Sequence, residues 1–303
     1  MKDMNRTIDY VVPMVFPSDP EWRKVLRGVT GTCYDAMGST QAVRYRSWGT
    51  EELLVRCVRK FMPWVRHIFI ILAQESQKQP WMDDYGIVVT YHRDFIPERY
   101  IPTFNSRTME MFLYRIPDLS DRFLYGNDDM FPLSPLSEAD FFQGGKPCQR
   151  YEELPFPDSP NLFHTACLNG LNFVAKDYGK HFTGTWLRNG HGIVPILRST
   201  CIDLWERHPK EISESITPFR DVRNFNQYIW GWEQHFSGNY VKYVPRRCLI
   251  TMRGEPTVMD ILNPILARNN NGIVCINDHE DVKDIEPFAK AARDAIRYKL
   301  GEL

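Results

Sequence analysis

Residues 50–73 read TEELLVRCVRKFMPWVRHIFIILA, a stretch that predicts a helix followed by a buried strand. Thr50 followed by two acidic residues is typical of a helix start, because acidic side chains favour the positive end of the helix dipole. Apolar residues then recur on one helical face as far as Phe61, and Pro63 lies just past the predicted end. The continuous apolar run at 67–73 has the length of one buried strand.

Similar signals on either side of this stretch predict an α/β fold. Apolar runs of strand length occupy 8–15, 87–91 and 122–126. A three–four spacing of apolar residues between Met109 and Ile116 predicts a second buried helix. Strands that alternate with helices in this order are typical of a Rossmann-like, mostly parallel sheet with helices on both faces.

The pattern changes after Phe131. Residues 132–160 are rich in Pro, Gly and Ser and predict a long excursion. Beyond it we expect helices over 161–178, 196–207 and 222–236, strands over 241–250 and 272–276, and a terminal helix over 286–300. This organisation predicts one catalytic domain over 1–303, with an α/β core at 1–131, a mainly helical lobe at 132–240, and strands that return to the sheet before the terminal helix at 241–303.

Bulk composition excludes several classes of protein. The formal net charge of the 303 residues is −1, so no overall charge attracts nucleic acid or an anionic bilayer. The seven cysteines form no CxxC pair, which favours a reducing compartment and argues against a zinc site or a disulfide framework. The apolar run at the start is too short for a membrane span. We therefore expect a cytoplasmic protein without a transmembrane segment.

The strongest candidate for chemistry is the stretch RFLYGNDDMF at 122–131. A predicted strand delivers Asn127, Asp128 and Asp129 at its carboxyl end, where ligands bind in open α/β sheets. These carboxylates suit Mg²⁺ or Mn²⁺ bound against a pyrophosphate, or one of them can act as general base. Both acids share a site only if the chain turns at Asn127, and the same triplet is also typical of a simple turn.

Several weaker signals suit the same cleft, and each also has a purely structural explanation. Thr103 and Asn105 precede a predicted helix, whose backbone N–H groups suit a phosphate or a simple cap. Asp19 follows the first strand and can bind a sugar hydroxyl or cap a helix. The glycines around His191 allow a ligand to approach the backbone closely. Arg220 and the pair Asn277–Asp278 suit a phosphate or a metal ion.

In combination, these segments resemble the Stealth family of sugar-phosphate transferases, which includes bacterial capsule polymerases and the lysosomal-enzyme N-acetylglucosamine-1-phosphotransferase. The resemblance runs in order from about residue 8 to 281. It is carried by IDYVVPMVFPSDPEW, by RYRSWGTEELLVRCVRKFMPWVRHIFII continuing to VTYHRDFIPERYIPTFNSRTMEMFLYRIPDLSDRFLYGNDDMF, by HGIVPILRSTCIDLWERHPKEISESITPFRDVRNFNQY and by VCINDHED.

The resemblance implies transfer of a hexose-1-phosphate from a UDP-sugar to a hydroxyl of an oligosaccharide or polysaccharide, with release of UMP, in capsule or other surface polysaccharide synthesis. It implies a divalent cation, Mg²⁺ or Mn²⁺. A lipid-linked acceptor would place the enzyme peripherally at the inner face of the membrane. Carried over by motif, the catalytic residues are Asp128, Asp129, His191 and Arg220. The donor-binding residues are Asp19, Arg44, Thr103, Asn105, Asn127 and Asn277, and the metal ligands are Asp129 and Asp278.

The chain departs from the family after the first strand, where Phe16 and Pro17 replace the usual polar residue and glycine. We therefore expect altered donor contacts in this loop. Two other functions use similar residues: a metal-dependent glycosyltransferase that releases UDP, and a non-catalytic protein that binds sugar nucleotides. The donated sugar, the acceptor hydroxyl and the oligomeric state stay open.

Overall fold

The computed structural model describes residues 7–31, 41–267 and 272–302. Five strands form a central sheet in which all neighbours are parallel except the pair at one edge, β10 and β4. From that edge the order is β10 (Val194–Leu197), β4 (Arg122–Tyr125), β1 (Ile8–Pro13), β2 (Ile68–Leu72) and β3 (Ile87–Tyr91). The predicted α/β class with a mostly parallel sheet is confirmed.

Both faces of the central sheet are buried. In β1, Tyr10 and Val12 enter one apolar core, whereas Val11 enters the other. β2 follows the same alternation, with Ile70 in the first core and Ile71 in the second. A strand that is covered on both faces needs an apolar side chain at nearly every position, which explains the continuous apolar runs in the sequence.

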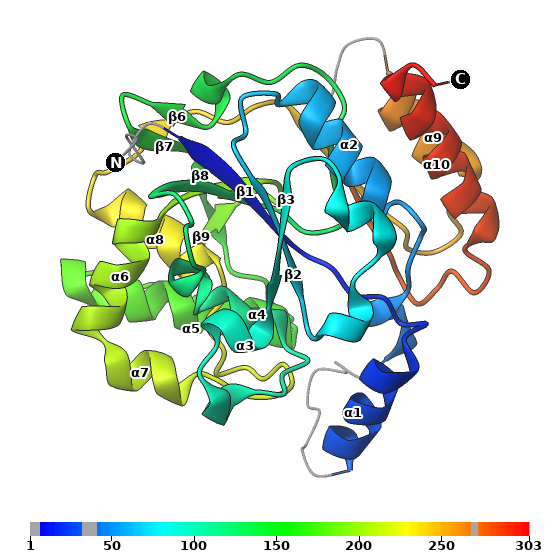
Figure 1. Cartoon of the computed structure of the whole chain (residues 1–303). Helices are drawn as coiled ribbons and strands as arrows, with labels where there is room; N and C mark the ends of the chain where they lie inside the picture. Colours follow the sequence, from blue (N-terminus) through cyan, green and yellow to red (C-terminus); the bar gives the residue numbers. More distant parts are fainter. Residues whose placement is uncertain (1–6, 32–40, 268–271, 303) are drawn as a thin grey trace.

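Two groups of helices cover the sheet from opposite sides (Figure 1). The first core is closed by α2 (Glu51–Phe61), α9 (Val258–Leu266) and α10 (Glu286–Leu300). The second is closed by α3 (His92–Phe95), α4 (Ser106–Glu110), α5 (Leu162–Ala175), α6 (Arg198–Arg207), α7 (Pro209–Glu214) and α8 (Tyr228–Phe236). Helix α1 (Pro20–Thr30) stands apart at one end of the molecule (Figure 1). Short 3₁₀ helices occupy 42–45, 75–77, 80–83, 98–100, 113–115, 138–140 and 176–178.

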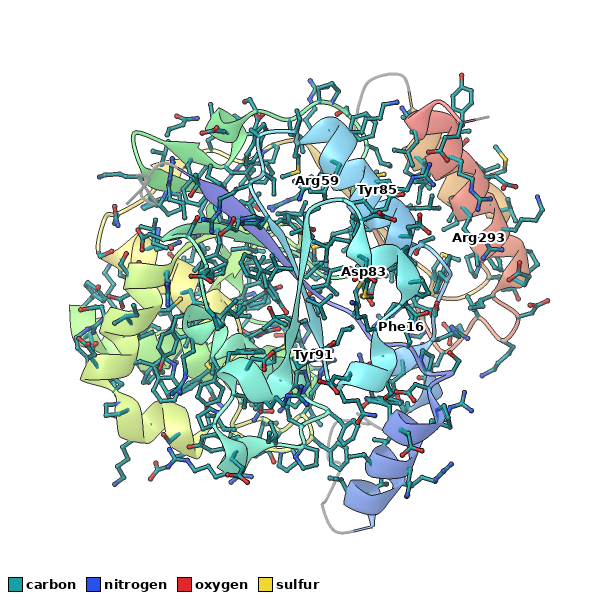
Figure 2. The ribbon with its side chains drawn as sticks, in the orientation of Figure 1. Phe16, Arg59, Asp83, Tyr85, Tyr91 and Arg293 are labelled. Carbon is teal, nitrogen blue, oxygen red and sulfur yellow. The ribbon has the colours of Figure 1, made fainter. Side chains whose placement is uncertain are left out.

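Hydrogen bonds of charged side chains connect β1 and α2 to the segments that precede the other parallel strands. The Asp9 carboxylate of β1 is fully buried and accepts hydrogen bonds from Arg66 Nη2 at 2.6 Å and from the Ser120 backbone N–H at 2.7 Å. On α2, Arg59 donates through Nε to the carbonyl oxygen of Tyr85 at 2.6 Å (Figure 2). These contacts join segments that immediately precede β2, β3 and β4.

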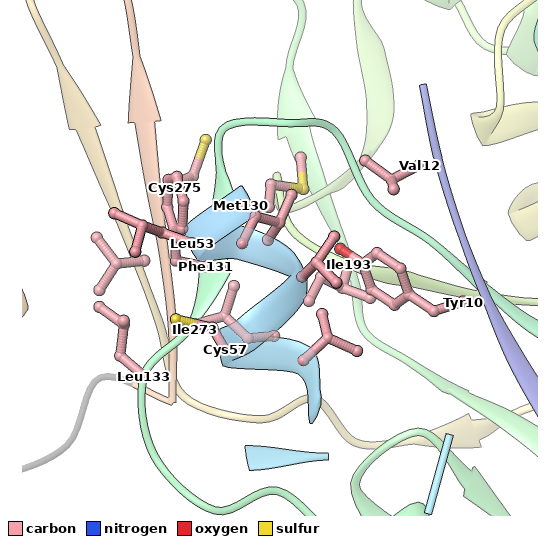
Figure 3. Packing of buried hydrophobic residues seen from close by; sticks show 14 of the residues in the cluster. Tyr10, Val12, Leu53, Cys57, Met130, Phe131, Leu133, Ile193, Ile273 and Cys275 are labelled. Carbon is pink, nitrogen blue, oxygen red and sulfur yellow. The ribbon is translucent and has the colours of Figure 1, made fainter. Parts of the chain in front are cut away.

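A second sheet begins where the central sheet ends. Strand β5 (Met130–Pro132) follows β4 after a turn and pairs with β13 (Ile273–Asn277), which also pairs with β12 (Arg247–Thr251). Side chains of β5 and β13 pack beside α2 in the first core (Figure 3). The late strands therefore do not return to the central sheet, contrary to the sequence-based expectation. The apolar runs in the sequence predicted that these strands exist. The amino-acid composition of a run does not determine which other strand it pairs with.

The excursion after β5 contains the small strands β6 (Phe142–Gln143), β7 (Lys146–Gln149) and β8 (Tyr151–Pro155). Two further small strands, β9 (Thr185–Asn189) and β11 (Val241–Lys242), come later in the chain and pair with β8 and β7. Three predicted helices also begin or end elsewhere. The apolar segment before α6 is strand β10, because a short apolar run fits either period. Helix α8 begins only at Tyr228, since the side chains of Asn224 and Asn226 hydrogen-bond nearby backbone N–H groups instead. The helix predicted around Met109 is α4 followed by a separate 3₁₀ turn.

In the part of the chain that the structure describes, no helix is long and apolar enough to cross a bilayer.

Candidate active site

A cleft of about 710 Å³ opens where the parallel strands end. Its floor includes Met14 after β1, Ala73 after β2, and Asp128 after β4. This is the edge at which ligands bind in open α/β sheets, because the loops after successive strands converge there. The predicted residues that line the cleft are Arg44, Thr103, Asn105, Asn127, Asp128, Asp129, His191, Arg220, Asn277 and Asp278.

The chain turns directly after β4, as a shared site for the two acids requires. The backbone N–H of Met130 donates to the carbonyl oxygen of Asn127 at 3.2 Å, which closes the turn. Just before it, Gly126 passes so close to Tyr10 that a Cβ atom there would lie 2.2 Å from the Tyr10 hydroxyl oxygen. The turn and the functional interpretation are therefore compatible, since both carboxylates reach the cleft.

Burial makes the two carboxylates resist ionisation. Burial, with smaller repulsion from Asp129 and Glu51, raises the pKa of Asp128 to about 8. Burial also raises the pKa of Asp129, although His191 and a hydrogen bond from the Cys275 thiol oppose the rise. Asp129 Oδ1 is buried without a hydrogen-bond partner among the described residues. A cation bound here would give the buried Oδ1 atom of Asp129 a partner. It would also favour the ionised form of both carboxylates, so the residues present fit a metal site.

His191 lies in the connection between β9 and β10 and faces Asp129. Burial is the largest influence on its pKa, and with Arg247 and Arg188 it outweighs Asp129, so the pKa is lowered. The Nδ1 atom lies 3.5 Å from the hydroxyl oxygen of Tyr228. The imidazole is therefore neutral near pH 7 and can accept a proton.

The glycines around His191 have a different role from the predicted one. A Cβ atom on Gly190 would lie 2.0 Å from Nη2 of Arg247, and one on Gly192 would lie 3.2 Å from Arg247 Cδ. The close approach that these glycines allow is therefore that of the Arg247 side chain. A local sequence pattern shows that something comes close to the backbone but does not identify the neighbour.

Arg220 lies in a group of buried charged residues that the sequence analysis did not identify. Its Nη2 atom donates to Ser106 Oγ at 3.0 Å. Arg107 and Glu110 of α4 are each 5% exposed and also line the cleft. Burial raises the pKa of Glu110 to about 7, although a backbone N–H of Gln227 and both arginines oppose the rise. The buried face expected for this helix consists of apolar residues from Met109 to Ile116, and neither Arg107 nor Glu110 belongs to it, so no signal in the sequence pointed to these two charges.

Five of the six predicted donor-binding residues line the cleft, and these five divide into two groups. Arg44, Asn127 and Asn277 line the cleft. Thr103 and Asn105 build its wall, because Asn105 caps α4 and its Nδ2 donates to Asn224 Oδ1 at 2.9 Å. The wall side chains thus position the segment that carries Arg220.

Asp19 and Asp278 have their own partners in the fold. Asp19 lies outside the cleft lining, caps α1 and accepts a hydrogen bond from Ser76 Oγ at 2.6 Å. Phe16, which precedes it, packs against the first core (Figure 2). Asp278 lines the cleft and forms an ion pair with Arg46 at 2.5 Å. Its carboxylate also accepts from Trp48 Nε1 at 3.0 Å. A metal ligand role for Asp278 stays a prediction.

Comparison with known proteins relates the chain to a family of polysaccharide-synthesising enzymes. Residues 44–149 match the family model described as Stealth protein CR2, conserved region 2. The capsular polysaccharide phosphotransferase WcwK of Streptococcus pneumoniae is 27% identical, over 93% of each chain. The receptor polysaccharide phosphotransferase WefC of Streptococcus oralis is 28% identical, also over 93% of each chain. A capsular polysaccharide phosphotransferase of Actinobacillus suis is 28% identical over 93% of this chain and 79% of its own.

The resemblance to the Stealth family predicted from the sequence is confirmed. Among solved structures, the galactosyltransferase LgtC, in complex with donor and acceptor sugar analogues, matches with a TM-score of 0.42 and 15% identity. That match covers 94% of this chain and 95% of the other. At this TM-score the two backbones differ too much for residues to be equated.

Proposed function

We propose that this chain, which carries Stealth conserved region 2 and is related over most of its length to polysaccharide phosphotransferases, transfers a hexose-1-phosphate from a UDP-sugar to a saccharide hydroxyl. The relatives bear out the expectation of a transferase enzyme. The product is a phosphodiester, UMP is released, and the reaction belongs to capsule or other surface polysaccharide synthesis. The acceptor is an oligosaccharide or polysaccharide, and a lipid-linked one would bring the enzyme to the inner face of the membrane.

One observation carries the proposal. Asp128, Asp129, His191 and Arg220 come from three segments of the chain that are far apart in the sequence, and all four line the same cleft. Carboxylates, a neutral imidazole and a guanidinium are the groups that phosphoryl transfer needs for charge stabilisation and proton removal. Their convergence at the carboxyl ends of the strands favours a catalytic site over a structural arrangement.

The proposed reaction forms one bond to phosphorus and breaks another. The acceptor oxygen bonds to the phosphorus that carries the sugar, and the bond from that phosphorus to the UMP oxygen breaks. The neutral imidazole of His191 takes the hydroxyl proton. Arg220 stabilises negative charge on the phosphoryl oxygens. Mg²⁺ or Mn²⁺ held by Asp129, with Asp128 or Asp278 nearby, would supply further charge stabilisation for the pyrophosphate.

The residues that line the cleft offer two kinds of surface to the substrates. Arg44, Asn127 and Asn277 offer polar groups for the nucleotide and its phosphates. Phe163 and Trp186 offer aromatic surface, which suits the apolar face of a sugar ring. We therefore assign the three polar residues to the UDP-sugar and the two aromatic residues to the acceptor.

The decisive experiment identifies the nucleotide that is released. Purified protein is incubated with a panel of UDP-sugars, Mg²⁺ or Mn²⁺ and oligosaccharide acceptors, and the products are separated by chromatography. We expect UMP, formed only with metal and lost on chelation. Asp128→Asn and His191→Ala should each lower the rate by about 10²- to 10⁴-fold, the usual contribution of such groups.

Asp203→Asn serves as the matched control, because Asp203 lies on α6 with its side chain 62% exposed and is not in the cleft lining. Its rate should equal that of the wild type. Release of UDP in place of UMP would make the chain a metal-dependent glycosyltransferase and refute the proposal. Tight donor binding without any release would support a sugar-nucleotide binding protein.

A further inference from the structure

Pairing between β5 and β13 brings a cysteine to the catalytic turn. Cys275 of β13 lies opposite Met130 of β5, and the backbone N–H of Ile276 donates to the carbonyl oxygen of Asp129 at 2.9 Å. The Cys275 side chain is 1% exposed, and its Sγ atom lies within 4.8 Å of a carboxylate oxygen of Asp129. The thiol therefore lies beside Asp129, behind the residues that line the cleft, although its sequence position gives no sign of it.

His191 completes a group of three different donor atoms. One carboxylate oxygen of Asp129, one ring nitrogen of His191 and Sγ of Cys275 all lie within 4.8 Å of one another. A second, independent feature points to a ligand at this place, because Asp129 Oδ1 is buried with no hydrogen-bond partner among the described residues. An oxygen, a nitrogen and a sulfur that converge in this way can bind one cation.

The donor set decides which cation binds best. Mg²⁺ prefers hard oxygen ligands, and a thiolate contributes little to its coordination. Zn²⁺ and Co²⁺ accept carboxylate, imidazole and thiolate ligands together, and three protein ligands leave one position open. The lack of a CxxC pair does not bear on this site, since its ligands come from three distant segments.

We propose that Asp129, His191 and Cys275 form a binding site for a thiophilic divalent cation of the Zn²⁺ class, and that its occupation inhibits the transfer reaction. On binding, the Cys275 thiol releases its proton to solvent and a sulfur–metal bond forms. The imidazole of His191 uses its nitrogen lone pair to bind the cation, so it can no longer accept the hydroxyl proton. The inhibition rests on the proposed function, whereas the binding does not.

Cobalt binding tests the site without any need for turnover. The metal-free full-length protein is titrated with Co²⁺, and the thiolate-to-cobalt charge-transfer absorption is recorded. We expect this band in the wild type and its loss in Cys275→Ser. Cys248→Ser is the matched control. Cys248 lies on the neighbouring strand β12, where it pairs with Val274 rather than with Cys275. Absence of the band in the wild type, or its persistence in Cys275→Ser, would overturn the proposal.

Zinc inhibition tests the consequence. UMP release is measured with excess Mg²⁺ at increasing Zn²⁺, relative to the activity of each variant without zinc. We expect Cys275→Ser to need at least about tenfold more Zn²⁺ than the wild type for half inhibition, since the loss of one ligand commonly weakens binding by that factor or more. Equal sensitivity would overturn the inhibitory role. A cobalt band in a protein that releases no nucleotide would refute the proposed function and leave the metal site standing.

Discussion

Replacing Glu110 by glutamine should remove a pH-dependent loss of stability. Glu110 lies on α4, is 5% exposed, and accepts a hydrogen bond from the backbone N–H of Gln227 at 2.7 Å. The hydroxyl of Tyr125 donates to its other carboxylate oxygen at 3.3 Å. Burial raises the pKa of Glu110 from 4.5 to about 7, so the folded protein holds this proton more tightly than the unfolded chain does.

The sign and size of the effect of Glu110 on the free energy of unfolding follow from proton linkage. Below pH 4.5 the carboxyl is protonated in both states and contributes no penalty. Between pH 4.5 and about 7 the unfolded chain loses the proton first, so stability falls as the pH rises. Above pH 7 the full penalty is present, and at ~1.4 kcal/mol per pH unit it amounts to about 3 kcal/mol. Glutamine has a similar shape, keeps a carbonyl oxygen as acceptor, and does not ionise.

Urea unfolding at pH 5, 6, 7 and 8, followed by tryptophan fluorescence, measures this difference. We expect the stability of Glu110→Gln relative to the wild type to rise by about 2 to 3 kcal/mol from pH 5 to pH 8. Glu98→Gln is the control, because Glu98 is exposed, and its difference from the wild type should not change with pH. A Glu110→Gln difference that stays constant within ~0.5 kcal/mol over this range would refute the reasoning, since that figure is near the error of such measurements.

Further predictions concern the turn, the buried carboxylate of β1 and the metal. Gly126→Ala should lower the free energy of unfolding by about 1 to 3 kcal/mol, because its Cβ would lie 2.2 Å from the Tyr10 hydroxyl oxygen. Tyr10→Phe in the same chain should recover part of this loss, and strictly additive effects in urea unfolding would contradict the proposed clash. Asp9→Ala should destabilise the fold by about 3 to 5 kcal/mol, because it leaves Arg66 and the Ser120 backbone N–H without their acceptor; a loss below ~1 kcal/mol would be inconsistent with this contact. Chelation should abolish UMP release and added Mg²⁺ should restore it, whereas activity that survives complete metal removal, measured by the same chromatography, would exclude a metal role in the proposed transfer.

Local patterns were sufficient for the strands and helices of the central fold. The apolar run at 67–73 became β2, and the terminal helix spans Glu286–Leu300 as its apolar periodicity predicted. Strands buried on both faces and amphipathic helices leave a signal within a few residues of sequence, because each side chain is selected for the face it occupies. The same applies to Asp128 and Asp129, which a strand delivers to the edge where ligands bind.

By itself, the sequence determined the α/β class, most of the elements, the family resemblance and the acidic turn after the fourth strand. Only the tertiary structure decided that β10 joins the central sheet, that β13 pairs with β5, and that Cys275 therefore lies beside Asp129. It also decided that Arg247, rather than a ligand, occupies the space beside Gly190. These contacts join residues far apart along the chain, and such pairings depend on how whole faces pack, which no local run of residues encodes.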